Sequence, residues 1–307
     1  MPQDLDLSWE TLRQIVRDWA GADATLTEVR RLDGGCINTT VALRLADDTR
    51  AVLKISPHRV DRSYECQARQ LDLLRSLGIP TPRVYACHTG TLDHPYSYLL
   101  MEFIEGMDWG AARRQAPADE SARLEHELAD LLLRLHGTAH PHYGAIADAS
   151  FTDWPACYRS LFDPIFKATC KSAHLGPKAR KSLHRVHDRL DRLLAHDDHP
   201  RLVHWDVWST NLLARRNGDG HWHITAMLDP DCKYAHYEVE LAYLELFQTV
   251  SGNFFTAYQR DRRLPREYHQ MRKPVYQLYA LMNHACLFGD RYTRPLSDAV
   301  NRVGALV

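Results

Sequence analysis

Residues 202–213 read LVHWDVWSTNLL and residues 221–231 read HWHITAMLDPD, and these two short stretches decide the fold of the chain. In each, an apolar run is followed by polar residues, which is typical of a buried strand that ends in a loop. Asp206, Asn211 and Asp229 fall at the loop positions beside the strand ends. They could simply stabilise turns, where Asp and Asn are common. Their oxygens are also the ligands that Mg²⁺ prefers, so a cation site is the second interpretation.

The spacing of these residues is that of a kinase catalytic loop. His204 is followed by Asp206 and, five residues later, by Asn211. In such a loop the Asp accepts the proton of the attacking hydroxyl and the Asn binds a metal ion. Asp229, at the end of the next apolar strand, takes the place of the Asp that holds Mg²⁺ against the nucleotide phosphates. The pattern favours phosphoryl transfer.

The residues before this region predict a small antiparallel sheet with one inserted helix. Ser8 can cap a first helix that ends at Gly21. Lys54 falls in the third strand and Glu65 in the first turns of the inserted helix, where kinases place a Lys and its partner. Lys54 could also decorate a strand face, as most strand lysines do. Strands are expected at residues 25–33, 37–45, 50–56, 83–88 and 97–103, and the inserted helix at 61–77.

A glycine pair lies between the first two predicted strands. Gly34 and Gly35 would let the backbone approach phosphate oxygens and offer amide donors to them. A plain hairpin turn is the alternative, since Gly-Gly is common there. Cys36 beside those amides could be redox sensitive, although an isolated Cys is more often an inert small residue.

After Gly106 the sequence is mostly helical, with the β-rich region at residues 201–229 embedded in it. Helices are expected at 118–136, 154–172 and 178–196, and from 238 nearly to the end. The predicted fold class is α+β, a protein-kinase-like fold with two lobes. Residues 1–103 would form a small five-stranded antiparallel lobe that binds nucleotide. Residues 104–307 would form a mainly helical lobe with the catalytic loop and the acceptor site.

Composition excludes several other classes of protein. The 307 residues are 45% hydrophobic, which is too apolar for a disordered or fibrous chain. The 38 basic and 39 acidic residues leave no net field that would attract nucleic acid, so no such partner is expected. The odd number of cysteines, seven without a CxxC pair, indicates reduced thiols and a cytoplasmic protein. No secretory signal and no apolar run near the ~20 residues of a membrane span is found, so no membrane is expected.

The later sequence carries a more specific resemblance. Residues 234–242 read YAHYEVELA, 245–247 read ELF, and 275–289 read VYQLYALMNHACLFG. Together with the catalytic loop, the Gly-Gly turn and LLMEF at 99–103, these segments resemble the fructosamine-3-kinase (ketosamine kinase) family. Its members are relatives of the aminoglycoside phosphotransferases and share a protein-kinase-like fold. The similarity extends from about residue 5 nearly to the end.

The resemblance implies roles for the residues of the nucleotide and catalytic sites. Asp206 would be the catalytic base, and Asn211 and Asp229 would bind Mg²⁺. Lys54 with Glu65 would orient the α and β phosphates of ATP.

The stretch around Glu102 and Phe103 would meet adenine through its backbone. Three positions depart from the usual family pattern. Trp205 and Val207 stand where the family usually has Gly and Leu on either side of the Asp, and Glu240 ends a motif that usually reads Glu-x-Asp.

The acceptor would lie near the catalytic loop and near the helix predicted at 275–289. Most apolar residues of that helix are expected to be core residues. Asn283 and His284 are polar exceptions and are predicted on the substrate side. Trp205, a large flat group beside the base, either packs inward or narrows the acceptor pocket.

The predicted function is an ATP-dependent, Mg²⁺-requiring kinase for a sugar hydroxyl, the 3-hydroxyl of a ketosamine such as a fructosamine or ribulosamine. Its partner would be a small amino-sugar or glycated amine. An aminoglycoside or other aminoalcohol phosphotransferase is the first alternative, and a nucleotide-binding pseudokinase is the second. Aminoglycosides are polycations, so their site should be ringed with carboxylates, and Glu238 and Glu240 do not decide the matter from sequence. The oligomeric state is not predicted.

Overall fold

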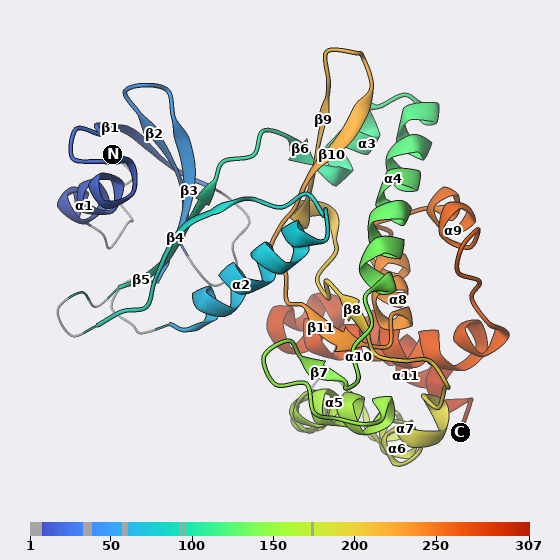
Figure 1. Cartoon of the computed structure of the whole chain (residues 1–307). Helices are drawn as coiled ribbons and strands as arrows, with labels where there is room; N and C mark the ends of the chain where they lie inside the picture. Colours follow the sequence, from blue (N-terminus) through green and yellow to red (C-terminus); the bar gives the residue numbers. More distant parts are fainter. Residues whose placement is uncertain (1–7, 33–38, 57–60, 92–93, 95, 173–174) are drawn as a thin grey trace. The chain divides into compact units, whose positions relative to one another are not determined.

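A five-stranded antiparallel sheet, with neighbours in the order β1-β2-β3-β5-β4, is built from the first hundred residues (Figure 1). The computed structural model describes residues 8–32, 39–56, 61–91, 94, 96–172 and 175–307. The sheet and the inserted helix confirm the prediction. Their bounds are β1 (Leu26–Arg31), β2 (Thr39–Leu45), β3 (Arg50–Ser56), α2 (Ser63–Ser76), β4 (Val84–His88) and β5 (Ser97–Glu102).

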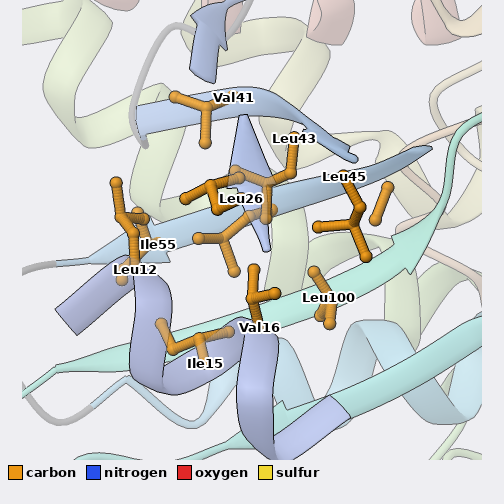
Figure 2. Close-up of a cluster of buried hydrophobic side chains, with 11 residues drawn as sticks. Leu12, Ile15, Val16, Leu26, Val41, Leu43, Leu45, Ile55 and Leu100 are labelled. Atoms are coloured by element: carbon orange, nitrogen blue, oxygen red, sulfur yellow. The ribbon is translucent and has the colours of Figure 1, made fainter. Parts of the chain in front are cut away.

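Helix α1 (Trp9–Ala20) covers one face of this sheet (Figure 2). It begins where the Ser8 side chain accepts a hydrogen bond from the Thr11 amide at 3.0 Å. Leu12, Ile15 and Val16 recur at helical spacing and pack on the sheet. The sheet contributes eight buried residues to this core: Leu26, Val41, Leu43, Leu45, Ala51, Leu53, Ile55 and Leu100.

Strand alternation sends neighbouring residues to opposite faces of the sheet. Leu100 packs in the core beneath α1, whereas Leu99 and Met101 pack with Tyr64 and Leu71 of α2. In β3, Leu53 belongs to the α1 face. Lys54, the next residue, therefore lies on the α2 face.

A second, three-stranded sheet belongs to the same compact unit of the chain. That unit consists of Met1–Pro117 and Ser209–Asp231. The strands pair in the order β10-β9-β6, and the Met227 amide donates to the Pro80 carbonyl at 2.7 Å. The elements are β6 (Met107–Asp108), α3 (Trp109–Gln115), a 3-10 turn (Ser209–Asn211), β9 (Leu212–Arg216) and β10 (Trp222–Met227).

The second unit, Ala118–Trp208 and Cys232–Val307, is mainly helical. It also holds a small sheet in the order β7-β11-β8. Its elements are α4 (Ala118–Gly137), β7 (Gly144–Ala145), α5 (Trp154–Lys171), α6 (Pro177–Asp188), α7 (Leu190–Leu193), β8 (Arg201–Val203), β11 (Lys233–Ala235), α8 (Glu238–Leu246), α9 (Gly252–Tyr258), a π-helical turn (Tyr268–Arg272), α10 (Lys273–Phe288), a 3-10 turn (Gly289–Tyr292) and α11 (Thr293–Gly304). Within the described parts of the chain, no helix is both long and apolar enough to cross a membrane.

Two expectations for the second half were wrong in detail. The helix expected at 178–196 is broken at Arg189, whose backbone leaves the helical region with φ −115°. The helix expected from 238 onward is interrupted, first at Gln248, where φ is +52°. The β-rich region expected at 201–229 is present, and its strands belong to two sheets, because β8 pairs with β11 while β9 and β10 pair with each other. The predicted lobe boundary at residue 103 stays a prediction.

Candidate active site

Lys54 and Asp229 meet in the first unit. The Lys54 ammonium donates to the Asp229 carboxylate and, at 3.4 Å, to the side-chain oxygen of Gln67. The Lys54 side chain is 12% exposed, whereas that of Asp229 is 44% exposed. The Asp229 carboxylate is thus paired with a largely buried ammonium and is still accessible to solvent. A charged molecule from solvent could therefore reach it.

The contact predicted between Lys54 and Glu65 is replaced by the one with Gln67. Glu65 accepts a hydrogen bond from the Thr89 hydroxyl instead. Residues two apart on a helix point about 200° apart, so α2 cannot turn both side chains toward β3. Gln67 was missed because the expected pairing has a carboxylate as the partner of the lysine.

Asn211 is coupled to the segment that ends in Asp229. Its side chain is buried, and its backbone carbonyl accepts a hydrogen bond from the Leu228 backbone amide at 2.8 Å. The Ser209 hydroxyl accepts from the Gly110 amide at 2.8 Å, which fixes the start of the same turn. Carboxylate and amide oxygens fit Mg²⁺. Among the described residues, no cluster of three or more His, Cys, Asp and Glu could hold a metal ion.

The residues predicted to meet adenine lie at the end of β5. The Glu102 amide donates to the Arg83 carbonyl at 2.8 Å, and the Glu102 carboxylate accepts from the Arg83 amide at 3.1 Å. The Arg50 guanidinium lies 4.5 Å from the centroid of the Phe103 ring. The Glu102 amide is therefore used inside the sheet. Gly34 and Gly35, the predicted phosphate turn, and Cys36 lie outside the described residues.

The loop that carries Asp206 belongs to the second unit and is anchored by Glu240. The backbone amide of Trp205 donates to Oε1 of Glu240 at 2.6 Å. The other carboxylate oxygen lies 2.8 Å from Nε2 of His136, whose Nδ1 lies 2.8 Å from the Tyr258 hydroxyl. Glu240 and His136 are fully buried, so their polar atoms need these partners. Sequence reasoning missed the anchoring role of Glu240.

Asp206 is half-buried and has a partner that the sequence did not indicate. The Tyr243 hydroxyl donates to Oδ1 of Asp206 at 3.2 Å. Burial, and next the negative charge of Asp206, raise the pKa of Tyr243 well above its usual range. Tyr243 therefore stays a protonated donor and orients the carboxylate.

Trp205 lies in the left-handed region, with φ +74°. Glycine adopts this conformation without cost, whereas an aromatic residue does so rarely. The indole is half-buried, and the Lys233 ammonium lies 4.6 Å from its ring centroid. The Tyr279 ring packs edge-on against the indole, with 6.4 Å between the two centroids. Tyr279 lies one turn before the half-buried Asn283 on α10, so Asn283 shares one helix face with a neighbour of the indole.

His284 lies on the adjacent face of α10. Its Nδ1 donates to the Ala280 carbonyl at 2.9 Å, and its ring centroid is 6.2 Å from that of Tyr243. Burial lowers the pKa of His284, and the charge of Asp206 opposes this only in part. The structure thus gathers Trp205, Asp206 and His284 in one neighbourhood of the second unit.

Glu238 is an interior residue. Its carboxylate forms two hydrogen bonds with the Arg272 guanidinium, of 2.5 and 2.8 Å, and is 1% exposed. Glu240 is equally buried. Neither carboxylate lines a surface.

Comparison with known proteins agrees with this geometry. Residues 8–305 match the family described as "Fructosamine kinase". The chain is 27% identical over 293 residues to the "Probable ketoamine kinase" of Klebsiella aerogenes, which covers 92% of this chain and 95% of that protein. A Haemophilus somnus 129PT crystal structure that carries the name fructosamine-3-kinase has a TM-score of 0.75 at 19% identity, covering 96% of this chain and 97% of that one. The aminoglycoside phosphotransferase APH(4)-Ia, in a complex with AMP-PNP and hygromycin B, has a TM-score of 0.68 at 16% identity, covering 96% and 97%. The two structural likenesses show a protein-kinase-like fold.

Proposed function

This chain belongs to the fructosamine kinase family, and from that premise we propose that it transfers the γ-phosphoryl group of ATP to the 3-hydroxyl of a ketosamine. It is a phosphotransferase with a sugar-like hydroxyl as acceptor. The family match carries the proposal, because residues 8–305 span both units and include Lys54, Asp206, Asn211 and Asp229.

Asp206 would act on the acceptor. Its carboxylate takes the proton of the sugar hydroxyl, whose oxygen forms a bond to the γ phosphorus while the bond from that phosphorus to ADP breaks. The Tyr243 hydrogen bond supports this role, since it fixes the orientation of the carboxylate. Glu240 supports it from the other side through the amide of Trp205.

Residues of the first unit would bind the nucleotide. Lys54 would contact the phosphates of ATP, and Asp229 and Asn211 would hold Mg²⁺, which neutralises phosphate charge when it is bound. The ion pair between Lys54 and Asp229 supports this proposal, because it brings the phosphate-binding cation next to the metal-binding anion. The complex of APH(4)-Ia with AMP-PNP supports ATP as the donor.

The acceptor class follows from charge. An aminoglycoside site needs carboxylates that face a polycation. Glu238 and Glu240 could have supplied such carboxylates. In the structure they are paired in the interior, Glu238 with Arg272 and Glu240 with His136. This favours a ketosamine with a single amine over an aminoglycoside. A pseudokinase is disfavoured because Lys54, Asp206, Asn211 and Asp229 are all present.

The lobes and the location are part of the same proposal. Residues 1–103 would bind nucleotide, and residues 104–307 would carry the catalytic loop and the acceptor site. A cytoplasmic location fits the cysteines at positions 66, 87, 157, 170, 232 and 286, all of which are free thiols.

The test is direct detection of the phosphorylated product by mass spectrometry. The protein is incubated with ATP and Mg²⁺ and with the fructose or ribulose adduct of a simple amine, and the phosphorylated position is read by NMR. Kanamycin serves as the polycationic control. Turnover of kanamycin alone would favour the aminoglycoside alternative, and no turnover of any acceptor would favour a pseudokinase.

A further inference from the structure

Five rings form a continuous strip that begins at Asp206. They are Tyr243 and Phe247 at the end of α8, His284 and Phe288 on α10, and Tyr292 in the turn that follows. Tyr243 donates to Asp206 and lies 4.7 Å from Phe247 between centroids, and Phe247 lies 4.5 Å from His284. His284 in turn lies 5.5 Å from Phe288 and 5.1 Å from Tyr292. We call these five residues the aromatic strip.

Phe288 is the one exposed residue of the strip. Tyr243, Phe247, His284 and Tyr292 are half-buried, and Phe288 at the far end is 48% exposed. A buried aromatic ring needs no ligand. A half-exposed phenylalanine that continues a row of rings away from a catalytic carboxylate leaves apolar surface for one.

The strip carries little charge. Nδ1 of His284 donates to the Ala280 carbonyl, and burial lowers the pKa of the ring, so His284 is neutral at neutral pH. The three glutamates of α8 point elsewhere: Glu238 pairs with Arg272, Glu240 with His136, and Glu245 with Lys273 at 2.8 Å. A ligand on the strip would therefore meet ring faces and edges rather than the carboxylates of α8.

We propose that the aromatic strip binds the substituent on the amine nitrogen of the ketosamine and selects apolar or aromatic substituents over cationic ones. This inference rests on the proposed function. With the 3-hydroxyl held at Asp206, the amine nitrogen on C1 is only two carbons from the reacting carbon. Its substituent therefore starts close to Asp206, where the strip begins, and extends along the strip. An apolar chain or ring buries the surface of Phe288 and stacks on its neighbours. A second ammonium loses hydration there, and the α8 glutamates are already paired.

The experiment compares three ketosamines with the same sugar part, made from one aldose with n-butylamine, putrescine and benzylamine. The first two differ only by a terminal ammonium group. We expect kcat/KM to be about tenfold higher for the butyl and benzyl adducts than for the putrescine adduct, with the difference in KM. Phe288→Ala should reduce this ratio to about threefold or less. Leu306→Ala removes an apolar side chain of similar exposure, 42%, outside the strip and should leave the ratio unchanged.

The outcomes separate the two proposals. If no adduct is phosphorylated, the proposed function fails, and calorimetric binding of the same three adducts still tests the strip. Equal kcat/KM or equal affinity for the three adducts, or a preference for putrescine, would overturn the inference. So would an unchanged ratio in Phe288→Ala. If light scattering shows a wild-type dimer that Phe288→Ala dissociates, the strip is an interface between copies instead.

Discussion

The backbone amide of Trp205 donates a 2.6 Å hydrogen bond to the buried carboxylate of Glu240. This bond ties the residue beside the proposed catalytic base to the interior of the helical unit, where the same carboxylate also meets His136. It also holds Trp205 at φ +74°, a conformation that costs an aromatic residue about 1–2 kcal/mol. The catalytic loop is thus shaped by a buried polar network.

Replacing Glu240 should damage both stability and turnover. Glu240→Ala leaves the Trp205 amide and Nε2 of His136 without their partner, so we expect a loss of about 3 kcal/mol in the free energy of unfolding and a lower kcat. Glu240→Gln keeps the shape and one acceptor oxygen and should lose about half as much. Urea unfolding and steady-state kinetics measure both effects. Wild-type kcat in Glu240→Ala would show that the network does not shape the loop.

Asp206→Asn should lower kcat by about 10²–10⁴, as expected for loss of a general base, and should leave nucleotide affinity nearly unchanged. Tyr243→Phe is the matched variant, because it keeps the base and removes only its hydroxyl donor. A reduction in kcat of about tenfold is expected there. Wild-type turnover by Asp206→Asn would exclude Asp206 as the base.

Asp229→Ala should abolish the Mg²⁺-dependent part of ATP binding, since it removes a charged ligand from a doubly charged ion. Calorimetric titration with ATP is done once in the presence of Mg²⁺ and once in the presence of EDTA. The difference between the two affinities is the Mg²⁺-dependent part of ATP binding. Gln67→Ala removes the other partner of Lys54 and should change the affinity for MgATP by less than about threefold. Unchanged MgATP affinity in Asp229→Ala would move the metal site elsewhere.

Two substitutions at Trp205 separate its backbone from its indole. Trp205→Gly and Trp205→Ala both remove the ring, but only glycine adopts φ +74° freely. The free energy of unfolding of the glycine variant should therefore be about 1 kcal/mol higher than that of the alanine variant, as measured in urea. Both should widen the range of acceptors and raise KM for the ketosamine while leaving KM for ATP unchanged. If the acceptor profile of both variants equals that of the wild type, the indole only packs against Lys233 and Tyr279.

The protein should lose stability as the pH falls below 6.5. His196 and His236 stack with centroids 3.6 Å apart. Burial, and then the charge of Arg272, lower the pKa of His196 to about 4, and burial holds that of His236 well below its usual value. In the unfolded chain these two histidines protonate near pH 6.5. Above that pH the folded protein therefore loses no stability through their protonation. Below it, stability falls by about 1.4 kcal/mol per pH unit for each histidine as the pH drops toward 4.

Urea unfolding at pH 7.5, 6.0 and 5.0 measures this slope. His196→Gln should flatten it by about half, because one of the two titrating groups is removed. A slope that is the same in both proteins would exclude His196 as a source of the pH dependence.

Local patterns in the sequence were enough to predict the sheet and to select the proposed site residues. The alternation in β3 and the helical spacing in α1 report the local backbone, and each needs only one buried face. The spacing of Asp206, Asn211 and Asp229 is a property of the chain itself, so the order of the amino acids is enough to find it. The roles of these three residues remain proposals.

The sequence by itself determined the five-stranded sheet with its inserted helix and the positions of the proposed ligands Asn211 and Asp229. Only the tertiary structure decided the partners of the proposed site residues: Gln67 rather than Glu65 for Lys54, Tyr243 for Asp206, and Glu240 for the amide of Trp205. The physical reason is that these contacts join residues 13 to 37 positions apart along the chain. Helix rotation and packing set such contacts, and a periodic pattern of apolar residues does not encode which polar side chain a turn of helix presents to a neighbour.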